Sequence, residues 1–287
     1  DKIDAIWKNV WDYGRATNYH QKFGMNYQVP LNKIPIVNFI SLNTRYNSSY
    51  DWTASLPAIS YLGNNIQNSN SKQYNGQINL TTLYNKVPYF KKLNQGNRRN
   101  RASSIRNRQN QEVVDAKKKF EFLKHMTRFA LGVKNISVNY SENQGTFLPG
   151  YLNQSKVLGQ DWSSLSPGLP FVFGSQSDIR KIGGENGWIT KSTDLNTMYK
   201  KNTSTNLTLR STVEPIKQFR IELTANKTTS DNYTEYYRWD DAFDSFSSFS
   251  PNESGSFSIS FISIITAFKG DRDNDESSVF NNFRNFR

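Results

Sequence analysis

The sequence lacks several features on which functional assignments usually depend. It has no cysteine, which excludes disulfide frameworks, zinc thiolate sites and thiol nucleophiles. Its two histidines, His20 and His125, are far apart in the sequence, and no Ser/His/Asp triad or metal-ligand spacing can be assembled around them. No glycine-rich loop joins a strand to a helix, so a phosphate cradle is also missing. We therefore predict no enzymatic activity, no catalytic residue and no cofactor.

A complete metal-binding motif is missing as well. Asp271, Asp273, Asp275 and Glu276 match the beginning of a calcium-binding loop. The glycine at the sixth position and the glutamate at the twelfth position of such a loop are not there. We therefore predict no metal site.

Long apolar runs are absent too, and none reaches the roughly 20 residues of a transmembrane helix. Hydrophobic residues make up 36% of the chain, which is low for a compact soluble core. The opening residues, DKIDAIWKNVWDYG, lack the basic and apolar regions of a signal peptide, so we expect either a cytosolic chain or a mature or internal piece of a longer one. Any membrane role falls to β-strands, in which only every second residue needs to be apolar.

What the sequence does contain is alternation, which is clearest between Ile36 and Ala54. The even positions are mostly apolar or aromatic, and from Ser41 onward the odd positions are polar. Successive side chains of a strand point to opposite faces, so the pattern predicts a ribbon with one apolar and one polar side. At about 3.3 Å per residue this ribbon is roughly 60 Å long. Such strands are typical of a transmembrane β-barrel, and a soluble β-sandwich is the alternative.

The same alternation recurs along the chain and predicts seven strands. They fall at residues 17–29, 36–54, 71–84, 128–142, 203–214, 218–237 and 256–268. A change of phase near Lys134 and Asn135 indicates a β-bulge in the fourth strand. One side of the third strand carries a series of amides, and because each unpaired buried polar group costs about 1 to 3 kcal/mol, we expect that side to be in contact with water.

The connections between these strands alternate in length. Those at 30–35 and 214–217 are short, whereas those at 55–70, 143–202 and 239–254 are longer. Outer-membrane barrels have short periplasmic turns and longer outer loops, so this order predicts that 143–202 is extracellular. The connection at 85–127, with a basic loop and an amphipathic helix at 112–126, then falls on the periplasmic side.

Seven strands cannot close into a barrel, because bacterial single-chain barrels have even numbers of strands from eight upward. The predicted fold is therefore all-β, an arc of about seven antiparallel strands from a very large transmembrane β-barrel. We treat residues 1–287 as a single segment of such a barrel.

Several motifs, spread over nearly all of the chain, are informative together. They are GRATNYHQKF, NYQVPLNKIP, TRYNSSYDWTA, LGNNIQNS, LYNKVPYFKKLN, ISVNYSENQGTFLPGY, PGLPFVFGSQSDIR and EPIKQFRIELTANKT. As a set they resemble the SprA/Sov family of outer-membrane translocons, which are the channels of the type 9 secretion system and serve protein export and gliding motility. The proteins of that family are many times longer than this chain.

The resemblance implies a bacterial outer-membrane protein and a single-chain barrel with a protein-sized lumen. It also implies a set of partners: the remainder of the same barrel, a PorV-type outer-membrane barrel, a periplasmic plug protein, outer-membrane lipid, and exported folded proteins that bear a C-terminal signal. Nucleic acid is not among them.

On this interpretation the two sides of the strands have different roles. The polar positions that would line a water-filled conduit are Asn43, Arg45, Asn47, Gln73, Asn75, Gln77, Asn79, Arg210, Arg220 and Glu222. The apolar positions that would face lipid are Ile40, Leu42, Ile78, Leu80, Val138, Leu207, Leu209, Ile221 and Leu223. The 143–202 loop would cap or gate the outer mouth, or grip a partner, through Leu148, Pro149, Gly150, Pro167, Gly168, Phe171, Phe173 and Gly174.

Two other functions remain open at this point. The first is a surface β-sandwich adhesin that binds glycans or proteins through its aromatic loops. The second is a nucleic-acid-binding module, because the formal charge is +12 and residues 97–111 contain five arginines. That stretch has no interleaved aromatic residues for base stacking, which disfavours the second alternative.

Overall fold

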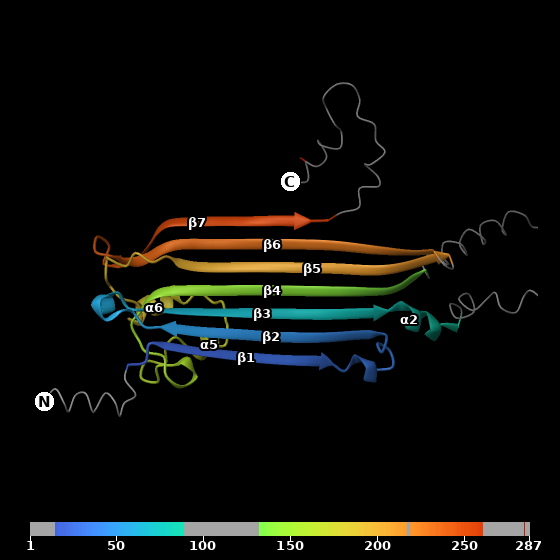
Figure 1. Cartoon of the computed structure of the whole chain (residues 1–287), viewed down its shortest axis with the longest axis horizontal. Coiled ribbons are helices and arrows are strands. Elements are labelled where there is room, and N and C mark those ends of the chain that lie inside the picture. The colour runs from blue at the N-terminus through green and yellow to red at the C-terminus, as the bar shows by residue number, and fades with distance from the viewer. Residues whose placement is uncertain (1–14, 89–131, 217–218, 261–283, 285–287) are drawn as a thin grey trace, which may run out of the picture.

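The protein is built on one long antiparallel sheet. The computed structural model describes residues 15–88, 132–216, 219–260 and 284. Within these residues seven strands pair in the order of the sequence, so that each strand lies beside the one that precedes it in the chain (Figure 1). The predictions of an all-β fold and of seven strands are confirmed.

The strands are long and the helices are short. The strands are β1 (Asn18–Val29), β2 (Ile40–Thr53), β3 (Asn64–Asn79), β4 (Val133–Tyr151), β5 (Tyr199–Ile216), β6 (Phe219–Asp240) and β7 (Ser245–Ile259). The helices are η1 (Leu31–Lys33), η2 (Pro57–Leu62), α2 (Leu80–Lys86), η3 (Val157–Gly159), α5 (Leu169–Val172) and α6 (Arg180–Glu185). With 22 residues, β6 is about 70 Å long at the usual rise of a strand.

The expected turn between the first two strands is present but longer than predicted. Pro30 precedes η1, in which the backbone N–H of Lys33 donates to the Pro30 carbonyl at 3.1 Å. Residues 35–39 form further turns, closed by a hydrogen bond from Ile40 N to Val37 O at 2.9 Å. The strand predicted from Ile36 therefore begins at Ile40.

The third strand begins earlier and ends earlier than predicted. The loop expected at 55–70 covers only residues 54–63, because β3 starts at Asn64. The strand expected to reach Tyr84 stops at Asn79, whose side chain accepts a hydrogen bond from Thr82 N at 3.1 Å and caps α2. Leu80 therefore lies in a helix, and its prediction as a lipid-facing strand residue is wrong.

Two of the predicted loops are also shorter than expected. The 143–202 loop is reduced to residues 152–198, which we call the excursion, because β4 continues to Tyr151 and β5 starts at Tyr199. Leu148, Pro149 and Gly150 therefore belong to a strand. The loop at 239–254 is a turn at residues 241–244, and the polar residues from Ser245 onward form β7.

Other predictions have mixed outcomes. The bulge expected near Lys134 and Asn135 is confirmed by a register shift between Val133 and Asn135. Several predictions lie outside the described residues: the basic stretch at 97–111, the helix at 112–126, residues 128–131 and 261–268 of the predicted fourth and seventh strands, His125 and the acidic stretch from Asp271. No helix within the described ranges is both long enough and apolar enough to cross a membrane.

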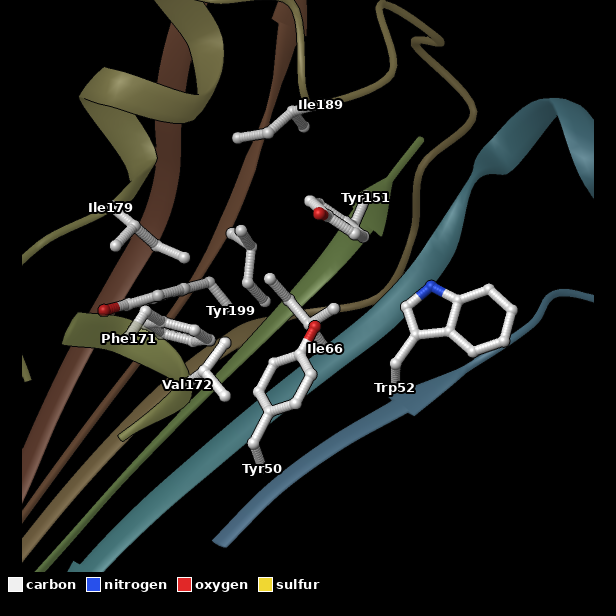
Figure 2. Close-up of a cluster of buried hydrophobic side chains, with 10 residues drawn as sticks. Tyr50, Trp52, Ile66, Tyr151, Phe171, Val172, Ile179, Ile189 and Tyr199 are labelled. Carbon is white, nitrogen blue, oxygen red and sulfur yellow. The ribbon is translucent and has the colours of Figure 1, made fainter. Parts of the chain in front are cut away.

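The hydrophobic core lies between the excursion and one end of the sheet. Tyr50, Trp52, Ile66, Leu148 and Tyr199 project from four adjacent strands, and each is at most 2% exposed. Phe171, Val172, Ile179 and Ile189 of the excursion pack against them (Figure 2). The rest of this face of the sheet has no such cover among the described residues, so the core occupies only the end at which β1 begins (Figure 1).

Two glycines test how tightly the excursion packs. Gly159 and Gly187 have nearly equal positive φ angles, +68° and +66°, so alanine is strained at both. A Cβ on Gly159 would lie 2.9 Å from the ring of Tyr50, whereas a Cβ on Gly187 would meet nothing within 4 Å. We expect Gly187→Ala to lower the free energy of unfolding by about 1 to 2 kcal/mol, and Gly159→Ala to lower it by about 1 to 3 kcal/mol more. Denaturant unfolding of the two variants measures the difference, and equal losses would contradict this packing.

Candidate functional site

The register of the sheet separates the predicted residues onto two faces. Directly paired residues of neighbouring strands share a face. One cross-strand row contains Leu42, Gly76, Val138, Leu209 and Ala225. The adjacent row, which points the other way, contains Asn43, Asn75, Asn139, Thr208 and Asn226. We call the face of Leu42, Val138 and Leu209 the band face, and the face of Asn43, Asn139 and Thr208 the polar face.

All but one of the predicted wall residues fall on the expected face. The band face carries the predicted lipid-facing residues Ile40, Leu42, Ile78, Val138, Leu207, Leu209, Ile221 and Leu223. The polar face carries the predicted lumen-lining residues Asn43, Arg45, Asn47, Gln73, Asn75, Gln77, Asn79, Arg210, Arg220 and Glu222. Leu80 is the exception, because it lies in α2.

The polar face is uniform over its middle. From the row of Ser41 and Gln77 to the row of Ser49 and Asn202, every position is a polar residue or glycine. Asn, Gln, Ser and Thr predominate there, and the charged residues in these rows are Lys22, Arg45 and Arg210. Side chains of this kind need water as a hydrogen-bonding partner, so this face is suited to an aqueous space.

A groove of 540 Å³ lies on the polar face. It is lined by residues that include Lys22, Asn47, Ser71 and Asn143. Gly24 and Gly145 line it too, and without side chains they leave the surface hollow where their neighbours would fill it. The groove has no acidic residue, so it contains no carboxylate for acid–base chemistry or for binding a metal.

The band face has an apolar zone away from the excursion. On β5 it extends from Val213, which is paired with Ile221 of β6, to Leu207. Val213 and Leu207 are six residues apart, so the zone spans about 20 Å along the strand. Large side chains in and beside this zone are open to solvent, among them Met25 and Ile259, which are 55% and 52% exposed. Exposed apolar zones of this kind are typical of a surface that meets lipid or another protein.

Aromatic and charged residues mark the border of the apolar zone on the side toward the excursion. Tyr74 and Tyr140 lie side by side in neighbouring strands, with ring centroids 6.0 Å apart. In the next row Lys72 and Glu142 form an ion pair at 3.7 Å. A sequence of apolar, aromatic and charged rows is the order found across a membrane interface.

Polar residues of the sheet bind the backbone of the excursion. The side-chain amide of Asn68 donates to the carbonyls of Phe171 and Ser175, both at 2.8 Å. The amide of Asn70 donates to Gly174 O at 2.6 Å. Tyr46 donates through its hydroxyl to Phe173 O at 2.5 Å. These contacts fix the excursion on the band face, beyond the border of the apolar zone.

The predicted cap residues are therefore placed differently from the expectation. Phe171 is buried against the sheet at 2% exposure, and Phe173 packs edge-on against Phe23 of β1. Pro167, Gly168 and Gly174 lie in the same excursion, on the band face, and not over the polar face. Asn68 and Asn70 were not predicted as functional residues, because residues 64–70 contain one apolar residue, Ile66, and show no alternation.

A partly buried arginine attaches the excursion to β5 and β6. The guanidinium of Arg180 lies over the ring of Tyr199, with its central carbon 4.5 Å from the ring centroid, and also contacts the rings of Tyr233 and Tyr237. It forms ion pairs with Asp178 at 2.6 Å and with Glu235, whose side chain is completely buried. The hydrogen bonds that Arg180 donates to the carboxylate of Asp178 hold the pKa of Asp178 below its usual value and raise the pKa of Arg180.

The histidine in the described parts of the chain pairs with a carboxylate. His20 hydrogen-bonds to Asp51 on the polar face, and no third group completes a triad. Within the same residues, no group of three or more His, Cys, Asp or Glu side chains is placed to hold a metal ion. Comparison of the chain with protein-family models finds no matching family, and comparison with curated proteins finds no relative.

Replacing Arg180 tests the attachment of the excursion. Arg180→Met leaves the buried carboxylate of Glu235 without its cationic partner, so we expect the free energy of unfolding to fall by about 3 to 5 kcal/mol. Lys181→Met is the matched control, because Lys181 is the next residue, is 84% exposed and pairs only at 4.0 Å with Glu185. We expect that change to have an effect below about 0.5 kcal/mol. Unfolding of both variants in denaturant measures the contrast, and similar losses would refute a structural role for Arg180.

Proposed function

We propose that this chain forms part of the wall of a protein-conducting channel in the bacterial outer membrane, of the kind that exports folded proteins in type 9 secretion. The observation that carries the proposal is the separation of the two faces. One face has an apolar zone about 20 Å tall, close to the roughly 25 Å lipid-facing band of outer-membrane barrels. The other face is polar over the same rows and beyond them.

The two open edges of the sheet support a larger assembly. Among the described residues, β1 and β7 each have a neighbour on one side only. An unpaired strand edge in lipid leaves backbone N–H and C=O groups without partners, at a cost of several kcal/mol for each group. In the proposed channel these edges pair with further strands of the same barrel, which is consistent with the resemblance to the SprA/Sov family.

The faces also suggest which side meets the substrate. The band face would meet lipid, and the polar face with its 540 Å³ groove would line the lumen. Neutral amides and hydroxyls offer no apolar surface to which a passing folded protein would adhere. In this arrangement the wall has a passive role, and no catalytic step is needed.

The orientation follows from the lengths of the connections. The connection that contains η1 and the end of β5 at Ile216, next to the start of β6 at Phe219, lie at one end of the sheet. This end would be periplasmic, as the short connections are in such barrels. The excursion lies at the other end and would be extracellular. Because it sits on the band face, it would stand on the outside of the wall above the lipid and not in the mouth of the channel. A role in gripping a partner, such as a PorV-type barrel, is favoured over a role as a gate.

A surface-exposed β-sandwich adhesin is the second candidate. Trp162 and Phe243 favour it, because they are 53% and 76% exposed on loops, where aromatic side chains bind glycans and proteins. A sandwich, however, covers its apolar face with a second sheet, and the described residues provide none for the zone around Leu209. Detergent phase partitioning separates the two functions, since a channel wall stays with the detergent and an adhesin domain stays in the aqueous phase.

A charged substitution tests the assignment of the faces. Leu209→Arg places a charge in the middle of the apolar zone, and we expect it to reduce the stability of the membrane-inserted protein by about 2 to 4 kcal/mol. Thr208→Arg is the matched control, because it introduces the same side chain one residue away on the polar face, and we expect a small effect. Urea unfolding from phospholipid vesicles measures both variants. Equal destabilisation would overturn the lipid-facing assignment.

A further inference from the structure

The groove of 540 Å³ on the polar face continues across the strands. It is lined from Lys22 on β1 to Asn202 on β5, so it crosses four strand spacings and is about 19 Å long. A second hollow of 310 Å³ adjoins it and adds Phe147 and Lys200 to the lining. The residues common to both hollows are Gln67, Gly145 and Asn202. We call the two hollows together the extended groove.

The floor of the extended groove contains glycines with asparagines beside them. Gly24 is paired with Asn47, and Gly145 is paired with Asn202. A Cβ on Gly24 would lie 3.0 Å from Asn47 Oδ1, and a Cβ on Gly145 would lie 2.6 Å from Asn202 Oδ1. The two amides therefore occupy the space that a side chain at either glycine would need. The floor is both hollow and polar.

The amides of the extended groove are free to bind a ligand. Within the described residues, no hydrogen-bond partner is present for the side chains of Asn47, Gln67, Asn143 and Asn202. On the opposite face, by contrast, the amide of Asn68 is used to hold the excursion. Each amide offers two N–H donors and a carbonyl acceptor, so the four together match a ligand that carries many hydroxyl groups.

An aromatic ring lies at one side of the extended groove. Phe147 is paired with Gln67 and with Lys200, and it is half-buried. The rows toward the middle of this face consist of polar residues and glycine, so the ring stands out from its surroundings. A ring face beside several amides offers one apolar contact among many hydrogen bonds. Sugars have this combination, because one side of a sugar ring carries C–H groups and its rim carries hydroxyls.

The charges of the extended groove are positive. Lys22 lines it at β1 and Lys200 lines it at β5, and both are exposed. No acidic residue lines either hollow. Asp51, in the row of Gln67, is outside the lining and hydrogen-bonds to His20. Two cations without a facing carboxylate favour a ligand with negative charge.

We propose that the extended groove is a binding site for an acidic oligosaccharide, a short chain of sugars that carry carboxylate groups. A peptide fits less well, because sheets bind peptides along a free strand edge, and β2, β3 and β4 each have a paired neighbour on both sides. The inference goes beyond a passive wall. It does not depend on the channel function, since the extended groove lies on the same face in an adhesin.

Titration calorimetry of the folded full chain, in a detergent without a sugar headgroup, tests the site. The probes are tetragalacturonate, neutral maltotetraose and the acidic peptide tetraglutamate. We expect tetragalacturonate to bind with a Kd about tenfold lower than that of either of the others. Absence of binding would overturn the proposal. Equal binding of maltotetraose would contradict the role of charge, and equal binding of tetraglutamate would show that the site does not recognise sugar.

Two pairs of substitutions locate the site. Asn143→Ala and Lys22→Gln are expected to weaken binding of tetragalacturonate by about fivefold each, since each removes a hydrogen-bonding group. Asn139→Ala and Arg45→Gln are the matched controls, because these residues lie on the same face outside the extended groove, and we expect no change. Equal losses in a variant and its control would overturn the location.

A third pair separates the extended groove from the aromatic loops of the adhesin candidate. Phe147→Leu keeps an apolar side chain but removes the ring, and we expect about threefold weaker binding of tetragalacturonate. Trp162→Ala, on the excursion, is expected to leave binding unchanged. The opposite result, a loss with Trp162→Ala and none with Phe147→Leu, would place the sugar on the loops and overturn the proposal. Neither result alters which face meets lipid, so the channel function is tested separately.

Discussion

The structure depends on the antiparallel ladder that holds seven long strands in one register. A slip of one residue in any strand would turn all its side chains to the opposite face, which would place amides in the apolar zone and leucines among the amides. The register prevents this, so that the row of Leu42 and Val138 stays on one face and the adjacent row of Asn43 and Asn139 stays on the other. Separation of polar and apolar surface, and with it the proposed wall of a channel, follows from that pairing alone. The helices contribute little to it.

The second organising element is the excursion, which turns one end of the band face into a packed core. Apolar contacts around Tyr50 and Tyr199 and amide hydrogen bonds from Asn68 and Asn70 act on the same segment. The ion pair between Arg180 and Glu235 adds a link to β6. One face of one sheet is thus divided into an apolar zone with no cover among the described residues, a polar border and a covered core. In the proposed orientation this order corresponds to lipid, headgroup and extracellular space.

Much of this arrangement could be predicted from the sequence, because alternation reports directly on the two faces of a strand. The strand count, the bulge near Asn135 and the faces of all the predicted wall residues except Leu80 followed from it. Strand ends were less predictable. Apart from Ile66, Asn64 to Asn70 are polar on both faces, so no alternation marked them as a strand. Pro149 and Gly150 suggested a loop although they belong to the end of β4. The core was missed because its contacts join residues about 100 positions apart, such as Tyr50 and Ser155.

The most direct test of the account is the environment of two adjacent residues on the central strand β4. Spin labels at Val138 and at Asn139 would point to opposite faces in the protein reconstituted in lipid bilayers. If the band face meets lipid, the label at 138 is relaxed mainly by oxygen dissolved in lipid, and the label at 139 mainly by a water-soluble nickel complex. A label at 138 that is as accessible to the nickel complex as the label at 139 would contradict it.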